Sequence, residues 1–287
     1  MSIFFTKNSI IKNTQYVKKY IKLFIPPIVL VVLNKLKKKQ YGWFGDYDNW
    51  TNAQNYASGY DSSKIIKKIK EASMKVRDEE VAYERDGALY NKIYYSWPLL
   101  SSIMLSSIQD GHVNVLDYGG SLGTSYFQNK KFLDNIECIS WNIVEQKRFV
   151  DIGKKYFEND KLHFYYDIKS CLKENKCNIL ILASVLQYIE NPYSLLDEVF
   201  KFDIPYILID RTQFSYKECD QITLQIVSPN IYDASYPCWF FDKYKMIDYF
   251  THNHYTLVEE FDVVDELDGK NEMYAFKGML WKNKYGD

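Results

Sequence analysis

Short apolar runs separated by amphipathic stretches organise the chain after residue 112. Two of these runs, residues 178–183 (NILILA) and 206–210 (YILID), lack alternation of apolar and polar positions, which is typical of strands buried on both faces. Helical patterns separate the runs, and strands that alternate with helices favour right-handed βαβ units in a parallel sheet. We predict such strands over residues 113–117, 137–144, 162–166, 178–183 and 206–210.

Two further apolar runs, residues 255–263 and 273–281, look like a closing pair of strands. With the five earlier runs they make seven strands. The predicted fold class is therefore α/β, with a doubly wound, Rossmann-like, seven-stranded and mostly parallel sheet. We place this domain at residues 111–287.

Residues 41–110 follow a different pattern, aromatic and punctuated by glycine at first and helical later. Asp48 or Asn49 is placed to cap a short helix in a region that otherwise reads as irregular. Apolar residues at helical spacing mark the longer helices. We predict helices over residues 50–56, 61–77 and 94–108, and we expect this accessory region to cap the domain.

A basic and apolar segment, residues 1–40, comes first. Its ten apolar residues, Phe24 to Leu33, are too few for a membrane-spanning helix, which needs about 20 residues. No small-residue cleavage site follows them, so the segment does not resemble a signal peptide. Two interpretations stay open. The segment is a buried helix that docks on the domain, or residues 18–39 lie on a membrane surface through apolar burial and the attraction of lysines to anionic lipid.

Composition narrows the classes of partner and compartment. The net charge is −1 and the isoelectric point is about 6.5, so no overall charge favours nucleic acid as a partner. The five cysteines form no CxxC pair, and no histidine stands at metal-ligand spacing. We therefore expect reduced thiols, no metal site and a cytoplasmic protein, which the membrane interpretation would place at the inner face of the membrane.

Candidate chemistry begins in residues 115–125 (VLDYGGSLGTS), where a strand leads through a glycine-rich loop into a helix. Glycines let the backbone approach a ligand closely, and doubly wound sheets bind ligands at this edge. Asp117 disfavours the pyrophosphate of a dinucleotide and favours a cation, and S-adenosyl-L-methionine carries both a sulfonium and an ammonium. We assign to this cofactor the residues Asp117, Gly119, Gly120, Ser121 and Gly123.

The later strand ends add further candidates. Glu145, at the end of the second strand, is placed to accept two hydrogen bonds from ribose hydroxyls. Asp167 follows the third strand, where an acid either meets the adenine amine or stands in a solvated loop. Ser184, Gln187 and Tyr188 follow the fourth strand, so we expect them near the cofactor and its methyl group; helix capping and packing are their alternative roles.

The glycine loop and the acids follow one another along the chain in the order seen in class I S-adenosylmethionine-dependent methyltransferases. The chain resembles this family from about Val113 to the C-terminus. The loop departs from the usual D/E-x-G-x-G-x-G because Ser121 stands at the middle glycine, and we expect the loop to accommodate this small residue. The resemblance implies S-adenosyl-L-methionine as cofactor and methyl transfer as the reaction.

A closer resemblance involves more of the chain. Five short motifs look like a family of bacterial methyltransferases found in surface-polysaccharide gene clusters. They are G-D-Y-x-x-W at 45–50, G-Y-D at 59–61, E-R-D-G at 84–87, I-D-R-T at 209–212 and A-S-Y-P at 234–237. This resemblance implies a role in polysaccharide biosynthesis, with a hydroxyl of a sugar or glycan precursor as the acceptor.

The stretch after the fifth strand, residues 212–239, is longer than a typical connection of about 2 to 6 residues. At the carboxyl edge of the sheet, a long loop is well placed to cover an acceptor. Its aromatic residues Tyr232, Tyr236 and Trp239 are candidates to stack on a sugar ring. A loop that only packs against the sheet edge is the alternative.

Asp210 is the first candidate for the general base that a hydroxyl acceptor needs, because it ends the fifth strand beside the predicted methyl group. Arg211 next to it favours the ionised carboxylate, or instead holds an anionic acceptor such as a phosphate. A purely structural contact between Asp210 and Arg211 is the alternative. With Tyr188, these two residues make up the predicted catalytic set.

Two other functions stay open. A nicotinamide-dependent oxidoreductase would need a G-x-G-x-x-G loop, which residues 119–123 do not supply. A catalytically silent, methyltransferase-like scaffold protein would keep Asp117 and Glu145 for cofactor binding alone.

Overall fold

The computed structural model describes residues 41–58, 62–108, 111–136, 138–215, 217–229, 231, 233–263 and 274–285. The basic segment 1–40, with both of its interpretations, and Tyr232 lie outside the described residues. The helices are α3 (Trp50–Tyr56), α4 (Ser62–Arg77), α5 (Trp97–Ser107), α6 (Thr124–Leu133), α7 (Lys147–Tyr156), α8 (Ile168–Glu174), the 3-10 helix η1 (Leu186–Tyr188), α9 (Pro192–Phe200) and α10 (Lys243–His252). The strands are β1 (Gly42–Tyr47), β2 (Tyr83–Arg85), β3 (Ala88–Tyr90), β4 (Val113–Tyr118), β5 (Ile139–Val144), β6 (Leu162–Tyr165), β7 (Ile179–Ala183), β8 (Tyr206–Ser215), β9 (Gln221–Ile226), β10 (Ser235–Asp242), β11 (Tyr255–Asp262) and β12 (Tyr274–Asn283).

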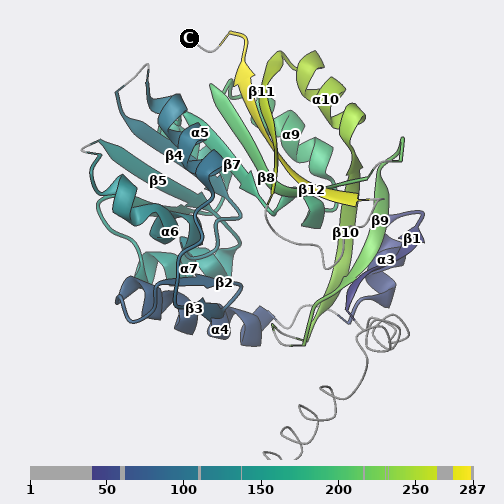
Figure 1. Cartoon of the computed structure of the whole chain (residues 1–287), viewed down its shortest axis with the longest axis horizontal. Helices are drawn as coiled ribbons and strands as arrows, with labels where there is room; N and C mark the ends of the chain where they lie inside the picture. Colours follow the sequence, from purple (N-terminus) through teal and green to yellow (C-terminus); the bar gives the residue numbers. More distant parts are fainter. Residues whose placement is uncertain are drawn as a thin grey trace, which may run out of the picture. The chain divides into compact units, whose positions relative to one another are not determined.

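A ten-stranded sheet forms the centre of the described part. Its parallel strands have the order β6–β5–β4–β7–β8, so the chain begins at β4, moves outward to β6 and then continues on the other side of β4. β12 pairs antiparallel with β8, and β11 pairs antiparallel with β12. The predicted doubly wound, Rossmann-like sheet is therefore confirmed, with all seven predicted strands present (Figure 1). The predicted number of strands is too low, because β1, β9 and β10 also belong to the sheet.

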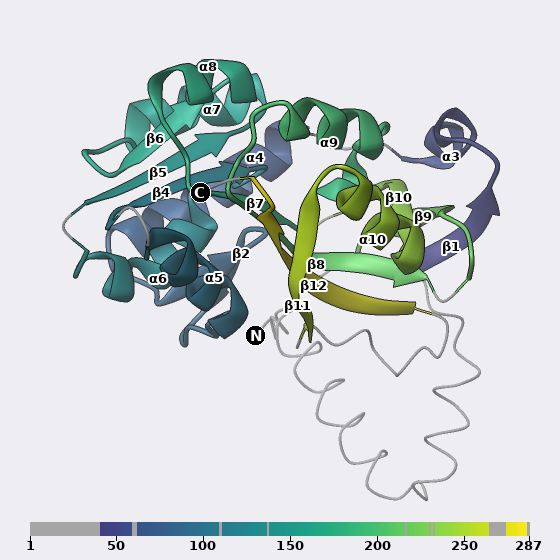
Figure 2. The same cartoon turned by 90° about the horizontal axis from the view of Figure 1, so that it is seen from above.

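Both faces of the parallel strands are buried. In β7, Ile179 and Ile181 belong to one core, while Leu180 and Leu182 belong to the other. The first core also includes residues of α4, α5, α6 and α7, and the second includes residues of α8, α9 and α10. Figure 2 shows α5 and α6 on one side of β4 and β5, and α8 on the other. Burial on both sides explains why β7 has no polar positions.

The fifth predicted strand does not end at Asp210, because β8 continues to Ser215. Up to Asp210 it pairs with β7, and at Phe214 and Ser215 it pairs with β10. The prediction of one long connection over residues 212–239 is therefore wrong, since β9 and most of β10 lie within it. β9 reads Q-I-T-L-Q-I, and this alternation of polar and apolar positions is typical of a strand, so the signal was present in the sequence but was assigned to a loop.

β1 pairs antiparallel with β9 and forms the outer edge of the sheet, next to α3 (Figure 1). The predicted helix 50–56 is confirmed, and its cap is Asn49, whose side chain accepts a hydrogen bond from the Asn52 backbone N–H at 2.9 Å. The prediction of irregular structure before this helix is wrong, because the glycine-punctuated residues form a strand with a shift in register between Phe44 and Tyr47. A β2–β3 hairpin lies between α4 and α5.

None of the helices in the described residues is both long enough and apolar enough to cross a bilayer.

Candidate functional site

A cavity of about 850 Å³, here called the central cavity, lies at the carboxyl ends of β4, β5, β7 and β8. It is situated where the strand order reverses, between β4 and β7, and doubly wound sheets bind ligands at such a point. Its residues from the strand ends are Asp117, Gly119, Gly120, Ser121, Glu145, Gln146, Ala183, Ser184, Val185 and Arg211. Nine of the predicted site residues line the cavity. They are Asp117, Gly119, Gly120, Ser121, Glu145, Ser184, Tyr188, Arg211 and Tyr236.

The glycines after β4 are required by close contacts. Gly119 has a φ of +74°, and a Cβ there would lie 2.6 Å from Cγ2 of Val185. A Cβ at Gly120 would lie 2.6 Å from Oδ2 of Asp117. The loop therefore closes tightly over the Asp117 carboxylate, with its backbone exposed to any ligand in the cavity.

Ser121, at the middle glycine position, has a φ of +54°, which costs about 1–3 kcal/mol in a residue other than glycine. The loop thus accommodates serine, as expected, but in a strained conformation. Asp86, Ser184 and Arg211 also have positive φ and also line the central cavity. Strained residues of this kind gather at functional sites, so their concentration marks this cavity independently of the motif.

Asp117 is the most buried acid of the central cavity, with 1% of its surface exposed. Its Oδ2 accepts a hydrogen bond from Nε1 of Trp141 at 3.1 Å. Burial raises the pKa of Asp117 to about 7, against the opposing effects of the Trp141 hydrogen bond and the Arg211 charge. A cationic ligand would compensate the buried carboxylate, because it favours the ionised form.

Glu145 directly follows β5 and is half-buried beside the loop. Burial raises the pKa of its carboxyl, while hydrogen bonds from the backbone N–H groups of Gln146 and Ser121 lower it. The bond from Gln146 measures 2.5 Å. These bonds fix the carboxylate at the edge of the cavity, beside the strained serine.

Aromatic side chains form another part of the lining. Tyr188 from η1 donates a hydrogen bond to Oε1 of Gln225 at 2.9 Å and packs edge-on against Tyr236, with ring centroids 5.2 Å apart. Trp43 and Trp50 contribute further rings from β1 and α3. The lining therefore combines apolar ring faces with amide and hydroxyl groups.

The β2–β3 hairpin brings Tyr83, Arg85 and Asp86 to the central cavity. Its buried Glu84 accepts hydrogen bonds from the Thr124 hydroxyl, at the start of α6, and from the Gly87 backbone N–H. Burial raises the pKa of Glu84, and these bonds lower it. Glu84 thus fixes the hairpin to the helix that follows the glycine loop.

Five predicted site residues lie outside the lining. Gly123 precedes α6 as its N-cap, and Asp167 caps α8 by accepting a hydrogen bond from the Ser170 backbone N–H at 2.7 Å. Gln187 is buried and donates to the Ser184 hydroxyl and the Arg211 carbonyl. Asp210 is also buried, and its Oδ1 accepts a hydrogen bond from the Arg211 backbone N–H.

Trp239, the fifth of these, stacks behind Trp50 at a centroid distance of 6.0 Å, and its Nε1 donates to the Ile189 carbonyl. It supports a ring of the lining without belonging to it. The roles proposed for these five residues, and for Tyr232, stay predictions.

Sequence reasoning missed several lining residues, including Trp43, Trp50, Arg85, Asp86 and Gln225. Arg85 and Asp86 belong to the E-R-D-G motif at 84–87, which was a visible signal without an assigned role. Gln225 belongs to β9, whose alternating polar and apolar residues were a strand signal that the prediction of a loop overlooked.

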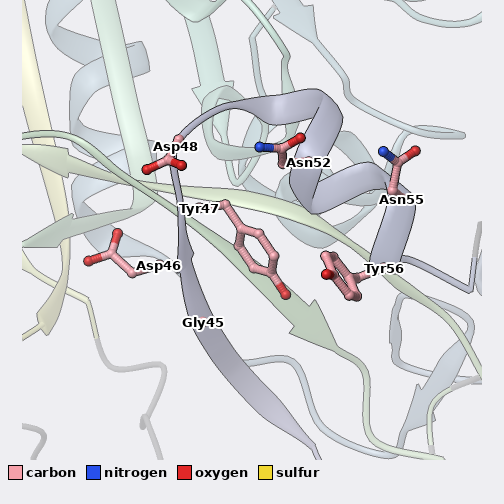
Figure 3. A pocket seen from close by; sticks show the side chains of 7 residues that line it. All are labelled: Gly45, Asp46, Tyr47, Asp48, Asn52, Asn55 and Tyr56. Carbon is pink, nitrogen blue, oxygen red and sulfur yellow. The ribbon is translucent and has the colours of Figure 1, made fainter.

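A second hollow, of about 540 Å³, lies against β1 and α3 (Figure 3). Figure 3 shows Tyr47 and Tyr56 on the same side of it, and their ring centroids are 5.7 Å apart. Its lining comes from residues 45–56 alone, so it brings together no residues from distant parts of the chain. Within the described part of the chain, no group of three or more His, Cys, Asp or Glu side chains is placed to hold a metal ion.

Comparisons with known proteins give matches among solved structures only. No family model matches the chain, and no curated protein matches it. The N-terminal domain of EvdMO1, in the presence of SAH and D-fucose, has 11% identity and a TM-score of 0.47, covering 78% of this chain and 97% of that one. A Burkholderia thailandensis 1,6-didemethyltoxoflavin-N1-methyltransferase with bound S-adenosylhomocysteine has 11% identity and a TM-score of 0.43, covering 86% and 97%. The glycopeptide N-methyltransferase MtfA, complexed with sinefungin, has 9% identity and a TM-score of 0.42, covering 64% and 85%.

Proposed function

We propose that this protein is a cytoplasmic S-adenosyl-L-methionine-dependent methyltransferase that acts on a hydroxyl of a sugar or glycan precursor. The observation that carries the proposal is the arrangement around Asp117. A buried carboxylate at the end of β4 is enclosed by Gly120, and Glu145 at the end of β5 lines the same cavity. Asp117 suits a cationic ligand, and Glu145 suits the hydroxyls of a ribose.

The same arrangement disfavours a nicotinamide dinucleotide. Its pyrophosphate would meet the carboxylate of Asp117 at the loop where a dinucleotide fold provides only backbone N–H groups. A methyl donor with positive charge fits the residues better.

The acceptor is proposed from the aromatic lining. Rings of Trp43, Tyr188 and Tyr236 offer apolar faces to a sugar, and Gln225 offers an amide to its hydroxyls. Asp117 and Glu145 would hold S-adenosyl-L-methionine, which would supply an electrophilic methyl group to the acceptor oxygen. The hydroxyl proton would pass to a base, for which Asp210 stays our candidate from the sequence although its carboxyl is buried outside the lining.

Calorimetric titration of the full chain with S-adenosyl-L-methionine and with NAD tests the cofactor. We expect the first to bind and Glu145→Ala to weaken it by about 10- to 100-fold, since two hydrogen bonds to a charged group are lost. Glu259→Ala, an exposed acid on β11, is the control and should change nothing. Binding of NAD alone would overturn the proposal, and unchanged affinity in Glu145→Ala would remove that residue from the site.

The acceptor class is tested separately, by mass spectrometry of surface glycan from cells with and without the protein. Loss of a methyl group from the glycan is the expected result. Identical glycans would contradict the proposed acceptor. If the protein nevertheless binds S-adenosyl-L-methionine, the scaffold alternative gains weight.

A further inference from the structure

Arg211 presents a guanidinium group at the centre of the cavity lining. It follows Asp210 in β8 with a φ of +48°, at the point where β8 passes from pairing with β7 to pairing with β10. Its side chain is half-buried, lines the central cavity, and has neither an ion pair nor a side-chain hydrogen bond within the described residues. A strained backbone therefore directs a half-buried charge, without a fixed partner, toward the ligand space.

A second arginine reaches the same space from a distant part of the sequence. Arg85 is on the β2–β3 hairpin, and its Nε donates a hydrogen bond to the Tyr83 hydroxyl at 3.2 Å. Burial raises the pKa of Tyr83, and the positive charges of both Arg85 and Arg211 act in the opposite direction. Both guanidinium groups are thus near one buried phenol, although they come from opposite ends of the domain.

Four acids also line the cavity. Asp117 and Glu145 belong to the strand ends where we place the cofactor, whereas Asp86 and Glu190 are exposed to solvent, where water and salt screen their charges. Arginine matches a phosphate well, because its planar fork donates two parallel hydrogen bonds to neighbouring oxygens. Two guanidinium groups that line the same cavity therefore favour an anionic ligand.

We propose that the acceptor carries a phosphate group, as a phosphorylated sugar does, and that Arg211 and Arg85 bind this group while the ring lies against Tyr188 and Tyr236. This rests on the proposed function and extends it from a sugar to an anionic sugar. The phosphate would fix the orientation of the sugar, so that one hydroxyl faces the methyl group.

The test is calorimetric titration of the full chain at low ionic strength with inorganic phosphate, both ligand-free and saturated with S-adenosylhomocysteine. We expect saturable binding that Arg211→Met and Arg85→Met each weaken at least tenfold, with Arg211→Lys in between. Arg148→Met is the matched control, because Arg148 is exposed on α7 outside the lining, and it should bind phosphate like the wild type. A parallel titration with glucuronate tests whether the protein prefers a sugar carboxylate to phosphate.

Absence of saturable phosphate binding, equal weakening in Arg148→Met, or tighter binding of glucuronate than of phosphate would overturn the inference. Since the Arg211 side chain has no ion pair or hydrogen bond among the residues that the structure describes, Arg211→Met should keep the thermal midpoint of the wild type; if it unfolds, Arg211→Lys provides the comparison. The experiment distinguishes a failure of the proposed function from a failure of the phosphate inference. No binding of S-adenosylhomocysteine contradicts the proposed function, whereas its binding without phosphate contradicts only the anionic acceptor.

Discussion

At the scale of single residues, Asp117 decides how the central cavity responds to pH. Its carboxyl has a pKa raised by burial to about 7, so in the ligand-free protein it is largely protonated below that pH. A cationic cofactor requires the ionised form. Binding below pH 7 must therefore release a proton, whereas binding above pH 7 need not.

We predict that affinity for S-adenosyl-L-methionine falls by up to about tenfold for each pH unit below 7 and is flat above it. Titrations between pH 5.5 and 8.5 measure this slope. Asp117→Asn should bind weakly at all pH values and lose the slope. A wild-type affinity that stays constant down to pH 5.5 would refute an ionised Asp117 in the complex.

The same residue affects the ligand-free fold in the opposite direction. Because the folded pKa lies above the ordinary value of 3.8, the folded protein binds more protons than the unfolded chain between about pH 4 and 7. The contribution of Asp117 to stability is thus present at low pH and is lost as the pH rises through 7. Asp117→Asn should make the ligand-free protein less sensitive to pH over this interval in thermal unfolding.

Gly120 offers a steric test of the loop. Its Cβ position lies 2.6 Å from Oδ2 of Asp117, and its φ is not in the left-handed region, so alanine acts here through contact alone. We expect Gly120→Ala to displace the carboxylate and weaken cofactor binding at least tenfold. Gly42→Ala is the control: nothing lies within 4 Å of its Cβ, so its unfavourable φ of +121° should affect stability and leave binding unchanged.

At the scale of elements, the β2–β3 hairpin depends on one buried acid. Glu84 is 2% exposed and joins the hairpin to α6 through Thr124. Glu84→Gln replaces an acceptor with a donor at one of its two bonds, so we predict a loss of about 1–3 kcal/mol in the free energy of unfolding. Glu80→Gln, an exposed neighbour, should have no effect.

Hydrogen exchange locates the consequence of that substitution. Faster exchange at the backbone amides of residues 83–90 is expected in Glu84→Gln, together with weaker phosphate binding through Arg85. If exchange there matches the wild type, the hairpin is held by other contacts, such as the tilted packing of Tyr83 against Tyr90.

How much of the sheet was predictable depends on burial. β7 and the first half of β8 are apolar on both sides, so their runs stood out, and Ser184 and Asp210 were found with them. β10 contains Pro237, which argues against a strand. β9 alternates polar and apolar residues as a strand does, but it was assigned to a loop, so Gln225 was missed although the signal was present. Arg85 needed tertiary structure for another reason, because its hairpin is only three residues a side.

At the scale of the whole molecule, the two interpretations of residues 18–39 make opposite predictions. If lysines hold the segment on anionic lipid, each contributes about 1 kcal/mol, and the full chain should float with anionic liposomes at low salt. Flotation should be lost in high salt and after deletion of residues 1–40. If the segment is a docked helix, the full chain stays in the soluble fraction, and the deletion lowers the thermal midpoint.

The pairing of β1 with β9 has a consequence for biosynthesis. Ser58 and Ser235, whose hydroxyls share a hydrogen bond beside this pairing, are 177 positions apart. A ribosome adding about 5–20 residues per second needs roughly 9–35 s to cover that interval. During this time Trp43 and Trp50 have emerged without the strand that will hold them. The ring-lined wall of the cavity is thus completed only late in translation, after the cofactor loop has been made.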